Sequence, residues 1–301
     1  MKRASFLILV LLVLSGCGSY QPIMETEPID TGVDPEAWAR IPAGEFNYGR
    51  HNEKITIAAD YEMMVTPVTN AQFASYLNQG LTSGDLKIDG DKVVVYYPGE
   101  PFQGVKHEEK IEAGDWPVLT LNAPATHLNY QDSAFSAQLG FANHPVVSVT
   151  WFGANAYCQA YGWRLPSEVE WERAARGDDE RSYPWGDSIE SNQANYYNSR
   201  DVFEKILGKQ GDTTPAGYYN GMTYADGYAT LDSASPFGLH DMAGNVWQWT
   251  GDDYEGVHYR YLRGGSKADY AYNLRVYSRN NSTPQTESIH FGFRCAREAT
   301  P

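Results

Sequence analysis

Residues 144–177 read HPVVSVTWFGANAYCQAYGWRLPSEVEWERAARG, and this stretch decides the fold that we expect. The segment HPVVSVTW at its start is typical of a short buried strand. A first helix follows, which Gly162 ends. The inward face of that helix is formed by four residues at helical spacing, namely Trp151, Ala154, Cys158 and Tyr161.

A second helix is predicted within the same stretch. Ser167 and Glu170 have the spacing of a capping box, and Gly177 is placed to end the helix. The residues expected to face inward are Trp171, Ala174 and Ala175. A strand followed by two short helices therefore forms the centre of the predicted fold.

The chain before this stretch gives further signals of short elements. IPAGEFNYG (41–49) alternates as a strand does, and Thr69 with Gln72 forms a capping box at the start of a helix. The buried face of that helix is expected to contain Phe73, Tyr76 and Leu77. LKIDGDKVVVYY (86–97) predicts a hairpin with its turn at Asp89–Gly90.

Residues 80–142 differ in composition and in predicted secondary structure from the rest of the chain. From Pro98 to Ala142 the sequence is mostly irregular and rich in Pro, Gly and Asn, and it contains no second hydrophobic core. We interpret 80–142 as an excursion inserted into one domain that spans residues 38–300. No internal repeat accompanies it.

Composition excludes some classes of function. The 301-residue chain is 42% hydrophobic and 20% charged, which fits a globular domain with a full core. Its formal net charge of −15 repels phosphate backbones, so a nucleic-acid partner is not expected.

The N-terminus predicts export and lipidation. MKR, an apolar run over residues 4–14 and the ending LSGC are typical of a lipoprotein signal peptide over 1–16, with Cys17 acylated. Gly18 after this Cys favours the outer membrane, and 17–37 is interpreted as a flexible tether. The alternative is an ordinary signal peptide with an incidental Cys. Once Cys17 is lipidated, Cys158 and Cys295 are the remaining cysteines, and in an oxidising compartment we expect them to pair.

Several long motifs resemble one known family. The 144–177 stretch is followed in order by YPWGD (183–187), FGLHDMAGNVWQWTGD (237–252), RGGS (263–266) and GFRCAR (292–297). In order and spacing they resemble the formylglycine-generating enzymes, also called sulfatase-modifying factors, from about Ile41 to Arg297. The resemblance implies an α+β, C-type-lectin-like fold with little regular secondary structure, short antiparallel strands and a few helices. It also implies the Cys158–Cys295 disulfide.

The resemblance further implies structural calcium, at two sites. The first would use the side chains of Asn195 and Asp226 with the carbonyls of Tyr196 and Tyr228. The second would use the side chains of Asp241 and Gln248 with the carbonyls of Gly244 and Val246. Oxygen ligands of these kinds suit Ca²⁺. At the last side-chain position many relatives have Glu where this chain has Gln248. The alternative is that the residues of both sites are turn or cap residues without metal.

The stretch RGGSKADYAYNLRVYSR (263–279) is where the active enzymes of the family hold copper(I) on a pair of cysteines. This stretch has no Cys, so neither copper nor formylglycine formation is expected. Trp247, Ser266 and Arg279 match residues that line the substrate groove of the family, and Asp269 is suited to polar contacts with a ligand. The alternative is a structural role for each. The seven histidines of the chain show no paired spacing of metal-ligand type.

Three functions remain open from the sequence. The first is an outer-membrane lipoprotein that acts as a binding or assembly platform for an envelope protein, peptide or glycan, for instance in secretion or gliding machinery. The second is a periplasmic oxidoreductase of altered chemistry, related to siderophore-maturation relatives of the family. The third is a purely structural envelope protein.

Overall fold

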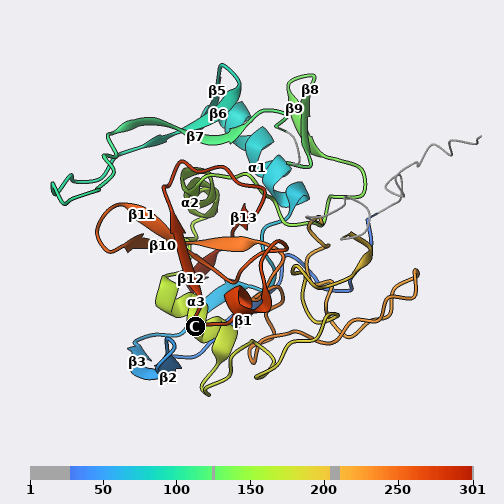
Figure 1. Cartoon of the computed structure of the whole chain (residues 1–301). Helices are drawn as coiled ribbons and strands as arrows, with labels where there is room; N and C mark the ends of the chain where they lie inside the picture. The colour runs from blue at the N-terminus through green and yellow to red at the C-terminus, as the bar shows by residue number, and fades with distance from the viewer. Residues whose placement is uncertain (1–27, 124–125, 204–210, 300–301) are drawn as a thin grey trace, which may run out of the picture.

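The computed structural model describes residues 28–123, 126–203 and 211–299. Short elements alternate with long irregular segments over this part of the chain (Figure 1). The helices are α1 (Asn70–Ser83), α2 (Trp151–Ala160), α3 (Glu168–Arg176) and the 3-10 helix η1 (Ala271–Leu274). The strands are β1 (Trp38–Ile41), β2 (Gly44–Tyr48), β3 (Glu53–Ile57), β4 (Tyr61–Met64), β5 (Leu86–Asp89), β6 (Lys92–Tyr97), β7 (Gly114–Thr120), β8 (Leu128–Gln131), β9 (Ala134–Ala137), β10 (Trp247–Tyr254), β11 (Tyr259–Arg263), β12 (Arg279–Ser282), β13 (Phe291–Gly292) and β14 (Ala296–Glu298).

The strands form several small sheets. Two hairpins, β2–β3 and β8–β9, stand apart from the three-stranded sheets β1–β4–β14 and β5–β6–β7. The four-stranded sheet has the order β12–β11–β10–β13, and in it β10 and β13 are parallel whereas the other pairs are antiparallel. The α+β fold class with short, mainly antiparallel strands is therefore confirmed.

The predicted helix caps are confirmed. The side chains of Thr69 and Ser167 each accept a hydrogen bond from the backbone of the third residue of their helix. Their own backbone N–H groups donate in return to the side chains of Gln72 and Glu170, which completes both capping boxes. Gly177 follows α3 with a positive φ of 76°, a conformation that glycine adopts without the steric cost of a Cβ.

The segment HPVVSVTW forms no regular strand, contrary to the prediction from its apolar pattern. Its backbone bonds to three separate segments, through Val146 N to Val68 O, Ser148 N to Ser288 O and Thr150 N to Val118 O. In addition, Ser148 has a φ of 58°, which interrupts the pleat. The segment is buried as predicted, but it is a junction between loops and not part of a ladder.

The 80–142 excursion packs on the central core. Seven of its buried apolar residues belong to the same cluster as α1, α2 and the disulfide, namely Leu86, Val93, Ile111, Val118, Leu119, Leu128 and Phe135. In Figure 1 the strands β5–β9 lie beside α1 and α2. The predicted hairpin is present, with Asp89 opposite Lys92, and β7 extends it to three strands.

The end of the predicted tether is packed and not free. Thr31 is buried, its hydroxyl donates to the Ala216 carbonyl, and Asn143 donates to the Ile29 carbonyl. Ile29 also contacts an aromatic cluster. These contacts hold the chain from about residue 29 onward, because an apolar side chain and a satisfied hydroxyl favour burial. Cys17, the predicted signal peptide and the rest of the tether lie outside the described residues.

The Cys158–Cys295 disulfide is present and joins α2 to the residue before β14. Both cysteines are fully buried, and they are separated by 137 residues. In the chain-entropy model a loop of this length stabilises the folded state by roughly 5 kcal/mol. The pairing expected from the cysteine count and from the family resemblance is therefore confirmed.

Within the described ranges no helix is long and apolar enough to cross a membrane.

Candidate functional site

A cleft of about 380 Å³ lies beside the four-stranded sheet. It is formed by chain segments that are far apart in sequence, from the turn after β2, the start of β10 and the region from η1 to β12. The residues that line it are Arg50, Trp247, Tyr272, Asn273, Tyr277, Ser278, Arg279 and Asn280. Trp247 and Arg279, two of the four predicted groove residues, are thus placed in the cleft together.

Asp269 braces the cleft from behind. Its Oδ2 accepts hydrogen bonds from Trp247 Nε1 at 2.8 Å and from the backbone N and the hydroxyl of Ser266 at 2.9 and 2.6 Å. Its Oδ1 accepts from Asn273 Nδ2 at 3.0 Å. Three of these bonds fall on Oδ2 and one on Oδ1, so the carboxylate has a structural role in holding the cleft. A contact between Asp269 and a ligand stays a prediction.

Ser266 has the same supporting role. It is buried, and its hydroxyl points to Asp269 and not to the cleft. The preceding Gly265 has a φ of +74°, and a Cβ there would lie 2.8 Å from Leu274 and 3.0 Å from the Asn273 carbonyl. The glycine before Ser266 therefore lets this turn pack directly on η1, which carries the cleft wall.

The open wall of the cleft is cationic and aromatic. Arg50 is exposed, and the Arg279 side chain is 47% exposed. The Arg275 guanidinium lies 4.9 Å from the ring centroid of Tyr272 and 6.0 Å from that of Tyr277, which orients both rings. Arginine forks in this setting suit a carboxylate or another oxyanion.

The sequence pointed to part of this cleft only. The tyrosines and arginines of 263–279 were visible as a polar, aromatic run, but nothing in the sequence connects Arg50 with them, because the tertiary fold brings β2 to this place. No cysteine lines the cleft, and the two cysteines of the described chain form the disulfide. The described residues therefore offer no free thiol there.

The residues of the first predicted calcium site have other contacts in the fold. The amide nitrogen of the buried Asn195 donates to the Asp212 carbonyl at 2.8 Å. Asp226 is exposed, and Oδ1 of its carboxylate accepts from the backbone N of Tyr228 within its own turn. The Tyr196 ring packs in an apolar cluster. These contacts leave the amide oxygen of Asn195 and the second carboxylate oxygen of Asp226 as the atoms that a calcium ion would use.

In the second predicted site, the amide oxygen of Gln248 already has two hydrogen-bond donors. Its Oε1 accepts from Trp171 Nε1 at 2.9 Å and from Arg294 Nε at 2.8 Å, which uses both lone pairs. Asp241 is buried, and its carboxylate accepts from Gly217 N at 2.7 Å. Desolvation raises the pKa of this carboxyl.

The backbone of this second region contacts the first. A Cβ on Gly244 would lie 2.3 Å from the Asn195 carbonyl, and Val246 is fully buried. The residues of the two predicted calcium sites thus contact each other at Asn195, and Asp226 takes no part in this contact. Calcium binding itself stays a prediction, which the effect of a chelator on the melting temperature would test.

The comparisons agree with this fold. The structure resembles that of PvdO from Pseudomonas aeruginosa, with a TM-score of 0.56 at 19% identity over 87% of this chain and 94% of that one. It also resembles CarF, with a TM-score of 0.52 at 20% identity over 88% of this chain and 98% of that one. The fold is thus the C-type-lectin-like variant that the motifs implied.

The family is shown by sequence. A family model described as the sulfatase-modifying factor enzyme 1-like domain matches residues 25–299. The formylglycine-generating enzyme of Mus musculus is 30% identical over 87% of this chain and 75% of its own length. The inactive C-alpha-formylglycine-generating enzyme 2 of Bos taurus is 38% identical over 86% of this chain and 87% of its own length. The chain therefore belongs to the sulfatase-modifying factor family.

Similar domains also occur within longer proteins. The serine/threonine-protein kinase pkn1 of Chlamydia caviae is 32% identical over 77% of this chain, and the matched part is 32% of that protein. This chain thus corresponds to about a third of that relative.

The supporting role of Asp269 can be tested against its neighbour. Replacement Asp269→Ala should lower the free energy of unfolding by about 2 to 4 kcal/mol, because it leaves Trp247 Nε1 and the Ser266 hydroxyl without their acceptor. Tyr270→Ala, at an exposed position, should cost less than about 1 kcal/mol. Urea unfolding of the two variants is the measurement. Equal stability of both variants would show that Asp269 is not a brace.

Proposed function

We propose that this protein is a non-catalytic binding module of the cell envelope, built on the fold of the formylglycine-generating enzymes. The cleft bounded by Trp247 and Arg279 would hold an acidic segment of an envelope protein. The observation that carries the proposal is a cleft in the region 263–280 that has arginines and tyrosines but no thiol.

The lack of a free thiol in the described residues supports a binding role. Copper(I) needs soft thiolate ligands, and the oxidation of a substrate Cys proceeds through a sulfur bound to that metal. The domain has two cysteines, and both are sequestered in the buried disulfide. Asp269 cannot substitute, because a carboxylate is a hard oxygen ligand, and this one already accepts four hydrogen bonds. One similar relative is itself named as an inactive formylglycine-generating enzyme.

The charge of the cleft supports an anionic partner. The chain has a formal net charge of −15, yet Arg50 and Arg279 both line this one cleft. A local cationic site on an acidic protein selects for negatively charged groups, since the remaining surface repels them. Protein, peptide and glycan partners were open from the sequence, and the two arginine forks favour the carboxylates of a peptide segment.

A lipid anchor on Cys17 at the outer membrane completes the proposal. It rests on the positive start, the apolar run and the LSGC ending of the sequence. An anchored domain would present its cleft at a membrane surface without an enzymatic role.

The absence of the family reaction is the first prediction. Purified protein supplied with copper(I) and oxygen should not convert the Cys of a Cys-x-Pro-x-Arg peptide to formylglycine. Mass spectrometry of the peptide detects the aldehyde, and a formylglycine-generating enzyme assayed in parallel is the positive control. Aldehyde above the level of a sample without protein would overturn the non-catalytic assignment.

The binding role of the cleft has its own test. A fluorescent oligoglutamate peptide should bind the wild-type protein in low salt, and binding should fall as salt rises. The double variant Arg50→Gln/Arg279→Gln should bind at least about tenfold more weakly, because two charge-assisted contacts are lost. Arg40→Gln is the matched control, since that exposed arginine pairs with Asp60 outside the cleft. Equal binding by the double variant and the control would rule out the cleft.

Lipidation is tested in cells. Cys17→Ser should release the protein from the membrane fraction and remove the added acyl mass seen by intact-mass spectrometry. A variant that stays membrane-bound with unchanged mass, apart from the substitution, would contradict the anchor.

A further inference from the structure

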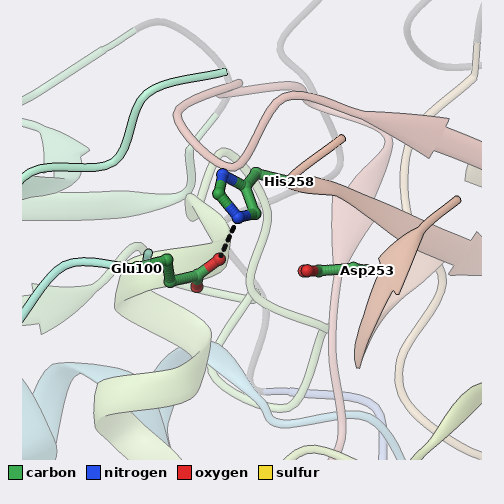
Figure 2. Close-up of side chains that lie close together, drawn as sticks. All are labelled: Glu100, Asp253 and His258. Atoms are coloured by element: carbon green, nitrogen blue, oxygen red, sulfur yellow. Dashed lines mark ion pairs between the residues drawn. The ribbon is translucent and has the colours of Figure 1, made fainter. Parts of the chain in front are cut away.

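A second polar cluster lies away from the cleft, where the 80–142 excursion meets the β10–β11 hairpin. It contains Glu100 and Glu108 from the excursion, Asp253 near the end of β10 and His258 just before β11. Ligand atoms of Glu100, Asp253 and His258 all lie within 4.8 Å of one another. Figure 2 shows the His258 ring with one nitrogen toward the Glu100 carboxylate, and Asp253 at the other side of the same space.

The imidazole of His258 is fixed in one orientation. Its Nδ1 lies 2.7 Å from the carbonyl oxygen of Glu109, which can only accept, so Nδ1 carries a proton. In the neutral ring Nε2 then has a free lone pair. This nitrogen lies 3.5 Å from Glu100 Oε2 and 3.6 Å from Glu108 Oε1, and the side chain is only 3% exposed. A ring nitrogen oriented by a backbone carbonyl on its other side is the usual arrangement of a metal-binding histidine.

The carboxylates of the cluster outnumber its one permanent cation. Glu100 and Asp253 both pair with the buried guanidinium of Arg260, which also lies 4.0 Å from the ring centroid of Trp151. Glu108 has a fully buried side chain that accepts hydrogen bonds from the backbone N of Gln103 and Val105. His258 adds a positive charge only when it is protonated, so a cation bound to its neutral ring would offset the excess of carboxylates in its place.

We propose that Glu100, Asp253 and His258, with Glu108 beside the imidazole, form a binding site for a divalent transition-metal ion of the zinc or manganese type. One imidazole nitrogen with carboxylate oxygens is a donor set for such ions. Calcium takes oxygen ligands and copper(I) prefers sulfur, so this site is distinct from both metals considered from the family resemblance.

The proposed ion would connect two parts of the fold. Glu100 and Glu108 belong to the loop between β6 and β7, whereas Asp253 and His258 belong to the β10–β11 hairpin that carries the sheet beside the cleft. Other contacts already join these parts, from Glu109 N to the Val257 carbonyl and from His258 Nδ1 to the Glu109 carbonyl. A metal at this place would therefore fix the excursion on the domain.

The test is binding of Zn²⁺ or Mn²⁺ alone to the full chain after treatment with a chelator, measured by isothermal titration calorimetry. We expect one ion per chain and a higher melting temperature in its presence. His258→Asn and Asp253→Asn should each weaken binding at least about tenfold. His51→Asn, outside the cluster, is the matched control and should bind as the wild type does.

Several outcomes would overturn the site. They are no saturable binding of either ion, unchanged affinity in Asp253→Asn, or binding of Ca²⁺ in its place with no dependence on His258. If His258→Asn does not fold, Asp253→Asn decides, because the Asp253 side chain is 34% exposed and its amide preserves the shape. The readout is metal affinity, so it is independent of the peptide-binding test of the cleft.

Discussion

The buried guanidinium of Arg294 is the constraint on which most of the irregular chain depends. Its five N–H donors go to Gln248 Oε1 and to four backbone carbonyls, those of Met64, Val65, His240 and Asp241. Because the loops have few partners of their own, one planar cation with five acceptors fixes three segments relative to one another. Burial lowers the pKa of Arg294 to about 9, which shows how strongly the site is removed from water. The neighbouring Cys295 adds a covalent tie to α2 at the same place.

A second buried network connects α3 to the cleft. Glu172 accepts from Gly49 N and pairs with Arg176 and Arg263, while Glu168 lies 3.8 Å from Arg279. The turn that carries Arg50 and the strand that carries Arg279 are thus held by carboxylates of one helix. Buried ion pairs of this kind stabilise less than their number suggests, but loss of one partner is costly, so they specify the geometry strongly. The contacts to α3 therefore fix the positions of these two walls of the cleft.

The same scaffold explains how family chemistry can be lost without loss of the fold. The brace formed by Asp269, Ser266 and Trp247 holds the cleft by hydrogen bonds that involve no metal. The disulfide and the Arg294 network contribute no residue to the lining of the cleft. Residues of the open wall are therefore free to change while the framework stays, which is the general separation of site from fold.

The sequence by itself determined the family, the fold class, the capped helices, the hairpin after Asp85 and the Cys158–Cys295 pair, because each depends on a local pattern or on a motif of fixed order. It also indicated that the chain lacks the cysteine pair that would bind copper(I), because this inference requires only a count of cysteines. The tertiary structure alone decided where polar residues go. Glu172 and Arg176 look like a solvated helix face, yet they are buried, because partners arrive from β2 and β11. Asp269 accepts four hydrogen bonds from its neighbours, and the Gln248 amide oxygen accepts from Trp171 and Arg294. Arg50 and the Glu100–His258 cluster carried no sequence signal at all, because their members are far apart along the chain and only folding brings their charges within reach of one another.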